Sequence, residues 1–244
     1  MKVLGIIPAR YGSTRFEGKP LADINGHTMI EWVYKRSLSS GYDKIIVATD
    51  DKRIFDNVLS FGGNVIMTKS HETGTDRIAE VALNMPEFDI VVNIQGDEPL
   101  VEGEMLKSLT KPFFEDSSVI MTTMKHLIKS EEEINNPNIV KVITDINDFA
   151  IYFSRSVIPY PRKLENTLYF RHIGLYGYKR EFLLEYAKMK QTMLEKTESL
   201  EQLRVLENGY KIKVVNTEFS VKGVDTAEDL KEVCKFIIDN NIHL

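Results

Sequence analysis

Residues 3–20 read VLGIIPARYGSTRFEGKP. The stretch begins with a short apolar run, 3–7, which a proline ends. Short apolar runs rich in β-branched residues predict buried strands. The residues that follow carry three cations, Arg10, Arg15 and Lys19, among small and turn-forming residues. The stretch is therefore predicted to be a strand that leads into a basic loop.

The same kind of apolar run recurs along the first hundred residues. Further predicted strands cover 44–48, 64–67 and 90–94, and segments with helical spacing lie near 28–40, 51–60 and 75–84. Alternation of strands and helices indicates βαβ units on a parallel sheet. The strands are almost continuously apolar, as expected when helices cover both faces of the sheet. The chain is therefore predicted to be of the α/β class.

The middle of the chain is richer in strands, which are predicted at 119–124, 139–144, 149–153 and 169–178. Proline and asparagine signals between them predict turns. We expect an antiparallel or mixed extension of the sheet, with a loop or arm near 155–168. The remaining predicted elements are helices near 102–115, 180–189, 198–207 and 226–240 and a strand at 211–215. Because no linker-like segment occurs, one domain over 1–244 is favoured, with a β-rich subregion at about 120–180.

Composition excludes several classes of protein. The net charge of −5 argues against a broad basic face that binds nucleic acid. A single cysteine, Cys234, rules out a disulfide framework and a Cys-rich zinc site, and its place in an apolar helical stripe predicts a packed thiol. The first apolar run is too short for a signal peptide, and no stretch approaches the ~20 apolar residues of a membrane helix. We expect a soluble, cytoplasmic protein without a membrane partner.

The residues after each early strand are the candidates for a binding site, because ligands of open α/β sheets bind beyond the carboxyl ends of the strands. The cations of the first loop, Arg10, Arg15 and Lys19, suit an anion such as a triphosphate, with a solvated basic loop as the alternative. The loop is not a Walker A motif, because its glycines are too far apart and a proline follows its lysine.

Two acidic positions are candidate metal ligands. Asp97 follows the strand 90–94, and a carboxylate beside bound phosphates usually implies a bridging divalent cation. The alternative is a turn-forming aspartate before Pro99. Asp225 precedes the last helix, with Glu228 three residues later, so that a capping box and a metal ligand are equally good interpretations.

The segment 71–77 follows the third predicted strand and leads into a helix. Thr73 or Thr75 is expected to cap that helix, whose amino end favours an anion. Arg77 falls in the first turn, where the helix dipole disfavours a cation. A bound ligand that contacts Arg77 explains its presence, and a surface arginine is the alternative.

The chain resembles the 3-deoxy-manno-octulosonate cytidylyltransferase family over essentially its whole length. The order and spacing of several motifs carry the resemblance: IIPARYGSTRFEGKPL (6–21), VATD (47–50), TGTDR (73–77), NIQGDEP (93–99), YFSRSVIPY (152–160), RHIGLYGY (171–178), LEQLR (200–204) and GVDTAEDL (223–230). Two departures occur, since the family often has proline at the position of Glu17 and serine at that of Thr73.

The resemblance implies a Rossmann-like three-layer nucleotidyltransferase fold, with a mixed, mostly parallel sheet and a β-rich arm that forms much of a homodimer contact. It implies a Mg²⁺-dependent enzyme that joins CMP from CTP to the acidic sugar 3-deoxy-D-manno-octulosonate (Kdo) and releases diphosphate. The product is expected to serve lipopolysaccharide or capsule synthesis.

The resemblance also implies roles for individual residues. The catalytic residues are expected to be Arg10, Lys19 and Asp97, and the metal ligands Asp97 and Asp225. The implied nucleotide-binding residues are Ala9, Arg10, Arg15, Lys19, Thr73, Gly74, Thr75, Arg77, Gln95 and Asp97. The implied sugar-binding residues are Arg155, His172, Tyr176, Glu201 and Gln202. By pattern alone, a packed or interface histidine and a solvated helix face remain alternatives for His172 and for the Glu201–Gln202 pair.

Two other functions stay open. One is the same reaction on 8-amino-Kdo, a sialic acid or another nonulosonic acid. The other is a nucleotide-binding regulatory or assembly protein without catalysis. The presence of Lys19, Asp97 and Asp225 together argues against this second alternative.

Overall fold

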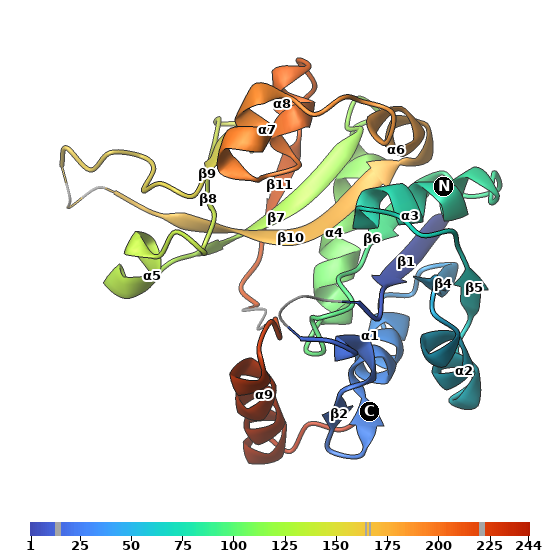
Figure 1. Ribbon diagram of the computed structural model, residues 1–244. Coiled ribbons are helices and arrows are strands. Elements are labelled where there is room, and N and C mark those ends of the chain that lie inside the picture. The colour runs from blue at the N-terminus through green and yellow to red at the C-terminus, as the bar shows by residue number, and fades with distance from the viewer. Residues whose placement is uncertain (13–15, 164, 166, 220–222) are drawn as a thin grey trace. The chain divides into compact units, whose positions relative to one another are not determined.

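The computed structural model describes residues 1–12, 16–163, 165, 167–219 and 223–244 and is drawn in Figure 1. The chain forms two compact units. The first unit contains Met1–Lys107 together with Val221–Leu244, and the second contains Ser108–Ser220. Each unit has its own sheet strands and its own helices.

The first unit is built on four parallel strands, β1 (Val3–Ala9), β4 (Lys44–Thr49), β5 (Val65–Met67) and β6 (Ile90–Asn93), in the order β6-β1-β4-β5. The connecting helices are α1 (Met29–Leu38), α2 (Lys52–Ser60) and α3 (Gly74–Leu83). Right-handed crossovers place α1 and α2 on one face and α3 on the other, as Figure 1 shows. The strand order reverses between β1 and β6, which is where such sheets bind ligands.

Short elements absent from the sequence prediction complete the first unit. They are the 3₁₀ turn η1 (Lys19–Leu21) and the hairpin of β2 (Asp23–Ile24) and β3 (His27–Thr28). Helix α9 (Ala227–Asp239) packs Val233 and Ile237 against Ile24 and Trp32 in a buried cluster, and the Trp32 indole donates to the Ile24 carbonyl over 2.8 Å. Cys234 packs partly buried against this cluster, and burial raises the pKa of its thiol.

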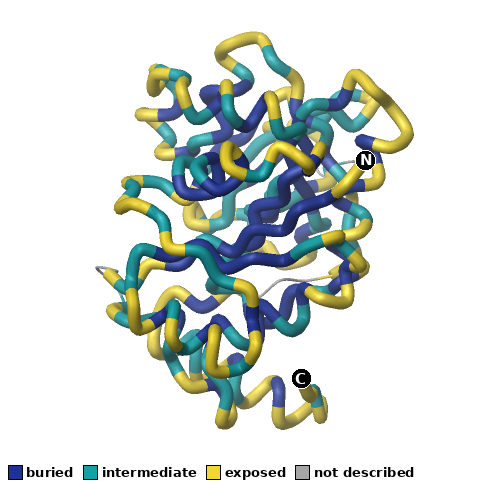
Figure 2. The backbone as a smooth tube through the Cα atoms, turned by 90° about the vertical axis from the view of Figure 1, so that its right-hand side faces the viewer, coloured by how far each residue is buried: buried dark blue, intermediate teal, exposed yellow. Residues whose placement is uncertain are grey.

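The second unit contains the strands β7 (Met121–Leu127), β8 (Lys141–Thr144), β9 (Ala150–Ser154), β10 (Phe170–Lys179) and β11 (Lys213–Asn216). Strand β7 is antiparallel to β10 and parallel to β11, whereas β8 is antiparallel to β9 and β10. Its helices are α5 (Glu131–Asn135), α6 (Arg180–Tyr186), α7 (Met193–Glu198) and α8 (Leu203–Glu207), and α4 (Gly103–Glu115) runs from the first unit into it. Strands are among the most deeply buried segments (Figure 2).

The predicted helix over 198–207 is wrong. Helix α7 ends at Glu198, Ser199 adopts a left-handed conformation with φ of 52°, and α8 begins only at Leu203. Leu200 in the connecting turn and Leu203 at the start of α8 are both buried, so their helical spacing occurs without a continuous helix. Glu201 and Gln202, which were expected on a helix, lie in this turn.

The predicted α/β class is confirmed. The first unit carries the parallel βαβ units, and the second carries the mixed strands expected of the β-rich middle. Within the described ranges, no helix is both long and apolar enough to cross a membrane.

We predict that Gly103→Ala destabilises the fold, because a Cβ at this helix start would lie 2.6 Å from the carbonyl carbon of Ser39. The expected loss in the free energy of unfolding is about 2 kcal/mol, measured by urea titration. Gly174→Ala is the control, since a Cβ there meets no described atom within 4 Å. Equal stabilities of the two variants would contradict the close approach.

Candidate functional site

A cavity of about 380 Å³ lies in the first unit, at the carboxyl ends of β1 and β6 and the amino end of α3. A cavity of this size is in the range of small-ligand sites. The predicted site residues that line it are Ala9, Arg10, Lys19, Thr73, Gly74, Arg77, Gln95, Asp97 and Asp225. The fold therefore gathers into one cavity side chains from four separate parts of the chain.

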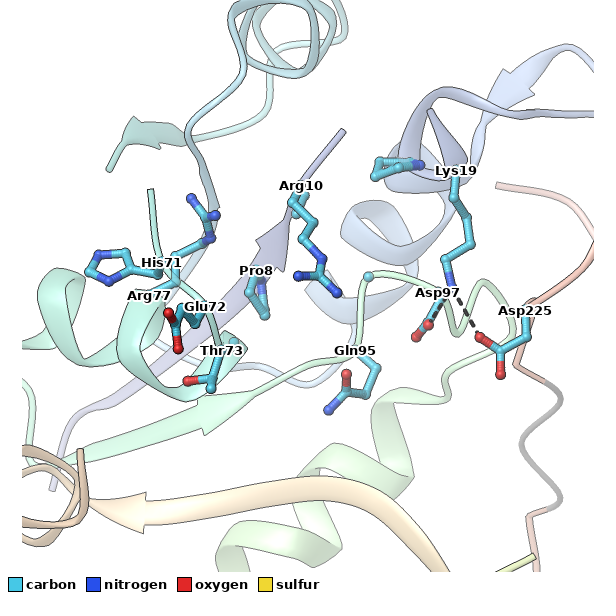
Figure 3. A pocket seen from close by; sticks show the side chains of 14 residues that line it. Pro8, Arg10, Lys19, His71, Glu72, Thr73, Arg77, Gln95, Asp97 and Asp225 are labelled. Atoms are coloured by element: carbon cyan, nitrogen blue, oxygen red, sulfur yellow. Dashed lines mark hydrogen bonds and ion pairs between the residues drawn. The ribbon is translucent and has the colours of Figure 1, made fainter. Parts of the chain in front are cut away.

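The Lys19 ammonium forms the polar centre of one end of this cavity. Its Nζ lies 2.7 Å from Oδ2 of Asp97 and 3.4 Å from Oδ1 of Asp225, and it donates to the Val224 carbonyl over 2.9 Å (Figure 3). The left-handed Gly18, with φ of 69°, precedes Lys19 and starts η1. Two carboxylates from distant segments thus converge on a single cation.

Asp225 is not the cap of the last helix. The N-cap of α9 is Thr226, whose hydroxyl accepts from the Asp229 backbone N–H, while the Asp229 carboxylate accepts from the Thr226 N–H. The capping interpretation of Asp225 with Glu228 is therefore wrong, because the box is shifted by one residue. The Asp225 carboxylate instead faces the cavity and Lys19.

The other end of the cavity is formed by the amino end of α3. Thr73 caps this helix, as predicted, and its hydroxyl accepts from the Asp76 N–H over 3.1 Å. Arg10 and Gln95 lie between this end and Lys19 in Figure 3. Helix amino ends and arginines both attract anions, so the cavity has the electrostatic character of a phosphate or carboxylate site.

Arg77 is buried, with 3% of its surface exposed, so the surface-arginine alternative is wrong. Its Nη2 lies 3.1 Å from Oδ2 of Asp50, which follows β4, and its Nη1 donates to the Thr68 hydroxyl over 2.5 Å. Arg77 also lines the cavity. The guanidinium therefore links the segments after β4 and β5 at the cavity wall.

His71 and Glu72 line the cavity although the sequence did not single them out. The His71 ring contacts the carboxylate of Glu80 on α3, and this hydrogen bond lowers the pKa of Glu80. The Glu80 carboxylate also accepts from the Lys69 N–H. A histidine nine residues before a glutamate has no characteristic spacing, so only the helix position of Glu80 reveals this pair.

The cavity lining differs from the prediction at Thr75. Thr75 is buried in α3 and is not among the lining residues. Arg15 lies outside the described residues.

The predicted sugar-binding residues all lie in the second unit. His172 and Tyr176 lie on β10 with their ring centroids 5.4 Å apart, and the His172 ring also meets Phe153 at 4.9 Å. Desolvation lowers the pKa of His172 to about 3 and raises that of Tyr176. Both residues are half-buried. At neutral pH, the pair therefore presents an uncharged imidazole and a protonated phenol.

Arg155 follows β9 and is bound by the chain itself. Its guanidinium donates to the carbonyls of Glu198, Pro137 and Ser199 over 2.8, 3.2 and 3.4 Å. The Glu198 carboxylate in turn accepts from the Arg155 N–H over 2.9 Å. Arg155 therefore caps the carboxyl end of α7, where a cation is electrostatically favoured.

Gln202 is buried, with 4% exposure, and its Nε2 has no hydrogen-bond partner among the described residues. Buried amides are normally paired, so an orphan donor points to a group that the chain itself does not supply. Glu201 precedes it in the turn between α7 and α8 and influences the pKa of Tyr176. The turn and β10 thus place predicted sugar-binding residues near one another.

Comparison with known proteins decides the family. Residues 4–212 match the family model described as cytidylyltransferase. A 3-deoxy-manno-octulosonate cytidylyltransferase of Fusobacterium nucleatum is 62% identical over 245 residues, with 100% of both chains covered. The chain belongs to the 3-deoxy-manno-octulosonate cytidylyltransferase family. It is therefore a nucleotidyltransferase, as the motifs predicted.

Other similar proteins support the same family assignment. The enzyme of the same name from Geotalea daltonii is 52% identical, with 98% of this chain and 99% of that one covered. A solved structure of CMP:2-keto-3-deoxy-manno-octonic acid synthetase complexed with CTP superposes with a TM-score of 0.94 at 42% identity, covering 98% and 100% of the chains. A 4-diphosphocytidyl-2C-methyl-D-erythritol synthase from Anaerococcus prevotii, at 16% identity and a TM-score of 0.65, shares the fold.

We predict that Thr226→Ala lowers the free energy of unfolding by about 1 kcal/mol, because it removes the cap of α9. Asp225→Asn leaves the helix cap intact and is the matched variant one residue away. Chemical denaturation of both proteins, without nucleotide, measures the difference. A larger loss in the free energy of unfolding for Asp225→Asn than for Thr226→Ala would indicate that Asp225 caps the helix.

Proposed function

We propose that this cytidylyltransferase transfers CMP from CTP to 3-deoxy-D-manno-octulosonate and releases diphosphate. One observation carries the proposal: Lys19, Asp97 and Asp225 converge at one end of a cavity in a chain that is 62% identical to an enzyme of that name. The solved relative complexed with CTP supports CTP as the nucleotide.

The nucleotide is proposed to bind in the cavity of the first unit. Arg10, Arg15 and Lys19 hold the triphosphate, since guanidinium and ammonium groups neutralise phosphate charge. The base and ribose lie against the amino end of α3 and the end of β6, where the residues involved are Ala9, Thr73, Gly74, Thr75, Arg77 and Gln95. The buried pairing of Arg77 with Asp50 supports a rigid wall at this place.

Mg²⁺ is the proposed cofactor, with Asp97 and Asp225 as its protein ligands. No group of three or more acidic, histidine or cysteine side chains suited to a metal occurs among the described residues. Two carboxylates nevertheless fit Mg²⁺, which commonly takes one or two carboxylates and completes its shell with water and substrate phosphates. Their convergence on the Lys19 ammonium supports this, because the site already accommodates positive charge.

The reaction is proposed to be an in-line attack by the anomeric hydroxyl of the sugar acid on the α-phosphorus of CTP. Asp97 and Asp225 would hold Mg²⁺, which when bound would supply neutralisation of phosphate charge and a lower pKa for the attacking hydroxyl. Lys19 and Arg10 stabilise the charge that grows on the α-phosphate and on the leaving diphosphate. Lys19 also positions Asp97 and Asp225, so that loss of its ammonium would disturb both carboxylates. Such chemistry depends on positioning and charge neutralisation.

The sugar acid is proposed to bind in the second unit, against Arg155, His172, Tyr176, Glu201 and Gln202. The orphan amide of Gln202 supplies a donor for a sugar oxygen or carboxylate. Neutral His172 and protonated Tyr176 offer hydrogen bonds without charge. Arg155, already bound to three carbonyls, is a preorganised partner for the sugar carboxylate.

The biological setting follows from the same proposal. The product is an activated sugar for lipopolysaccharide or capsule synthesis, made in the cytoplasm, where CTP is available. The enzyme is proposed to act as a homodimer through the β-rich segment at about 120–180, without nucleic-acid or membrane partners.

A diphosphate-release assay with CTP, Mg²⁺ and a panel of acidic sugars tests the function. We expect the highest kcat/KM with Kdo and no release without Mg²⁺. A higher kcat/KM with 8-amino-Kdo or a nonulosonic acid would identify that sugar, in place of Kdo, as the substrate. Absence of release with every sugar, in a folded protein that binds CTP, would favour a regulatory nucleotide-binding protein.

We predict that Asp97→Asn lowers kcat with Kdo by at least ~100-fold while the protein stays folded, because a carboxylate that holds the metal is lost. Asp56→Asn is the control, since Asp56 forms an exposed ion pair with Lys52 on α2 and does not line the cavity. Circular dichroism and kcat at saturating Mg²⁺ are the measurements. Near-normal turnover of the folded Asp97→Asn variant would show that Asp97 is not a metal ligand.

A further inference from the structure

A buried ion pair joins helices α7 and α8 in the second unit. The Arg204 guanidinium forks onto both oxygens of Glu195, with Nε 2.8 Å from Oε2, and its Nη1 donates to the Met189 carbonyl over 2.8 Å. Arg204 and Glu195 are only 7% and 5% exposed. Hydrogen bonding to Glu195 raises the pKa of Arg204, so the guanidinium keeps its positive charge. None of the proposed catalytic or sugar-binding roles uses it.

The two helices need such a clamp because both are short. Helix α7 has six residues and α8 has five, too few to be stable by themselves. Glu195 accepts from the Thr192 N–H at the start of α7, and Glu207 of α8 accepts from the Leu194 N–H over 3.0 Å. The turn between the helices, which carries Glu201 and Gln202, therefore takes its position from contacts between the helices.

Tyr186, at the end of α6, connects this clamp to the turn. Its hydroxyl donates to the Glu201 carbonyl over 3.0 Å, and the Arg204 guanidinium carbon lies 5.6 Å from the centre of its ring. The residue is 2% exposed, and desolvation raises the pKa of its hydroxyl well above the usual value. The phenol therefore stays protonated and acts as a hydrogen-bond donor.

The Tyr186 ring also reaches β10. It stacks on Tyr178 with centroids 6.0 Å apart, and Tyr178 stacks on Tyr176 at 6.1 Å. Tyr176 in turn contacts His172 at 5.4 Å. A continuous line of side chains thus runs from the Glu195–Arg204 pair through Tyr186 to the two proposed sugar-binding residues of β10.

We infer that Tyr186, held by the Glu195–Arg204 pair, is a positioning residue that sets the affinity for the acidic sugar. It holds the turn that carries Glu201 and Gln202 at a constant distance from the His172–Tyr176 face of β10. The two halves of the proposed sugar site belong to different elements, and Tyr186 is bonded to one and stacked on the line that leads to the other. This inference rests on the proposed function, since it assigns the sugar to these residues.

Tyr186→Phe tests the inference, because it removes the hydrogen bond to the Glu201 carbonyl and keeps the ring. We expect the KM for Kdo to rise about five- to tenfold, the value of one lost hydrogen bond to a buried group. The KM for CTP is expected to stay within about twofold of the wild-type value, because no nucleotide-binding residue belongs to this line. Arg204→Lys keeps the positive charge but loses the two-pronged contact with Glu195. It is also expected to raise the KM for Kdo.

Tyr210→Phe is the matched control. Tyr210 belongs to the same aromatic group through its ring contact with Phe182, and its hydroxyl contacts the carboxylate of Glu185, a residue of α6 and not of the turn. The Tyr210→Phe variant also loses one tyrosine hydroxyl. Its KM for Kdo and its KM for CTP are both expected to stay at the values of the wild-type enzyme. Urea titration of each variant separates a loss of stability from a loss of affinity.

The outcomes distinguish this inference from the function on which it rests. A wild-type enzyme that releases no diphosphate with any acidic sugar refutes both. An active wild-type enzyme, with a Tyr186→Phe variant whose KM for the sugar is unchanged or rises equally with that for CTP, refutes the positioning role alone. A loss of stability with both KM values unchanged also refutes it, because Tyr186 would then support the fold without setting the sugar site.

Discussion

The interaction on which the cavity of the first unit depends is the contact of one ammonium group with two carboxylates. Lys19 comes from η1, Asp97 from the turn after β6 and Asp225 from the segment before α9. A carbonyl of the same late segment also accepts from Lys19. Charges of opposite sign, brought together at the edge of the sheet, stabilise one another and hold three separate segments of the chain together.

Buried guanidinium groups organise the loops in both units. Arg77 links Asp50 and Thr68 at the wall of the cavity, and Arg204 links α7 and α8 through Glu195. Arginine suits this task because its fork makes several directed hydrogen bonds and it keeps its charge when buried. Binding residues on loops need such support, since loops lack the backbone hydrogen-bond ladders that hold strands and helices in place.

Prediction from the sequence succeeded where one physical rule dominates. Continuous apolar runs identified β1, β4 and β6 because strands covered on both faces have little choice of residue. It failed where two rules compete. The spacing of Leu200 and Leu203 suits one helix, but α7 ends before the left-handed Ser199 and α8 begins only at Leu203. Asp225 and Thr226 are both good caps, and the structure selects Thr226.

The sequence alone determined the class of fold and, through its motifs, the family, and it indicated the edge of the sheet at which the cavity lies. These follow from local periodicity and from residues a few positions apart. Only the tertiary structure decided that Asp225 faces Lys19, that Arg77 is buried against Asp50, and that Glu201 and Gln202 lie in a turn anchored by Tyr186. Such pairings join residues far apart in the chain, and no local pattern encodes them, because they depend on how whole elements pack.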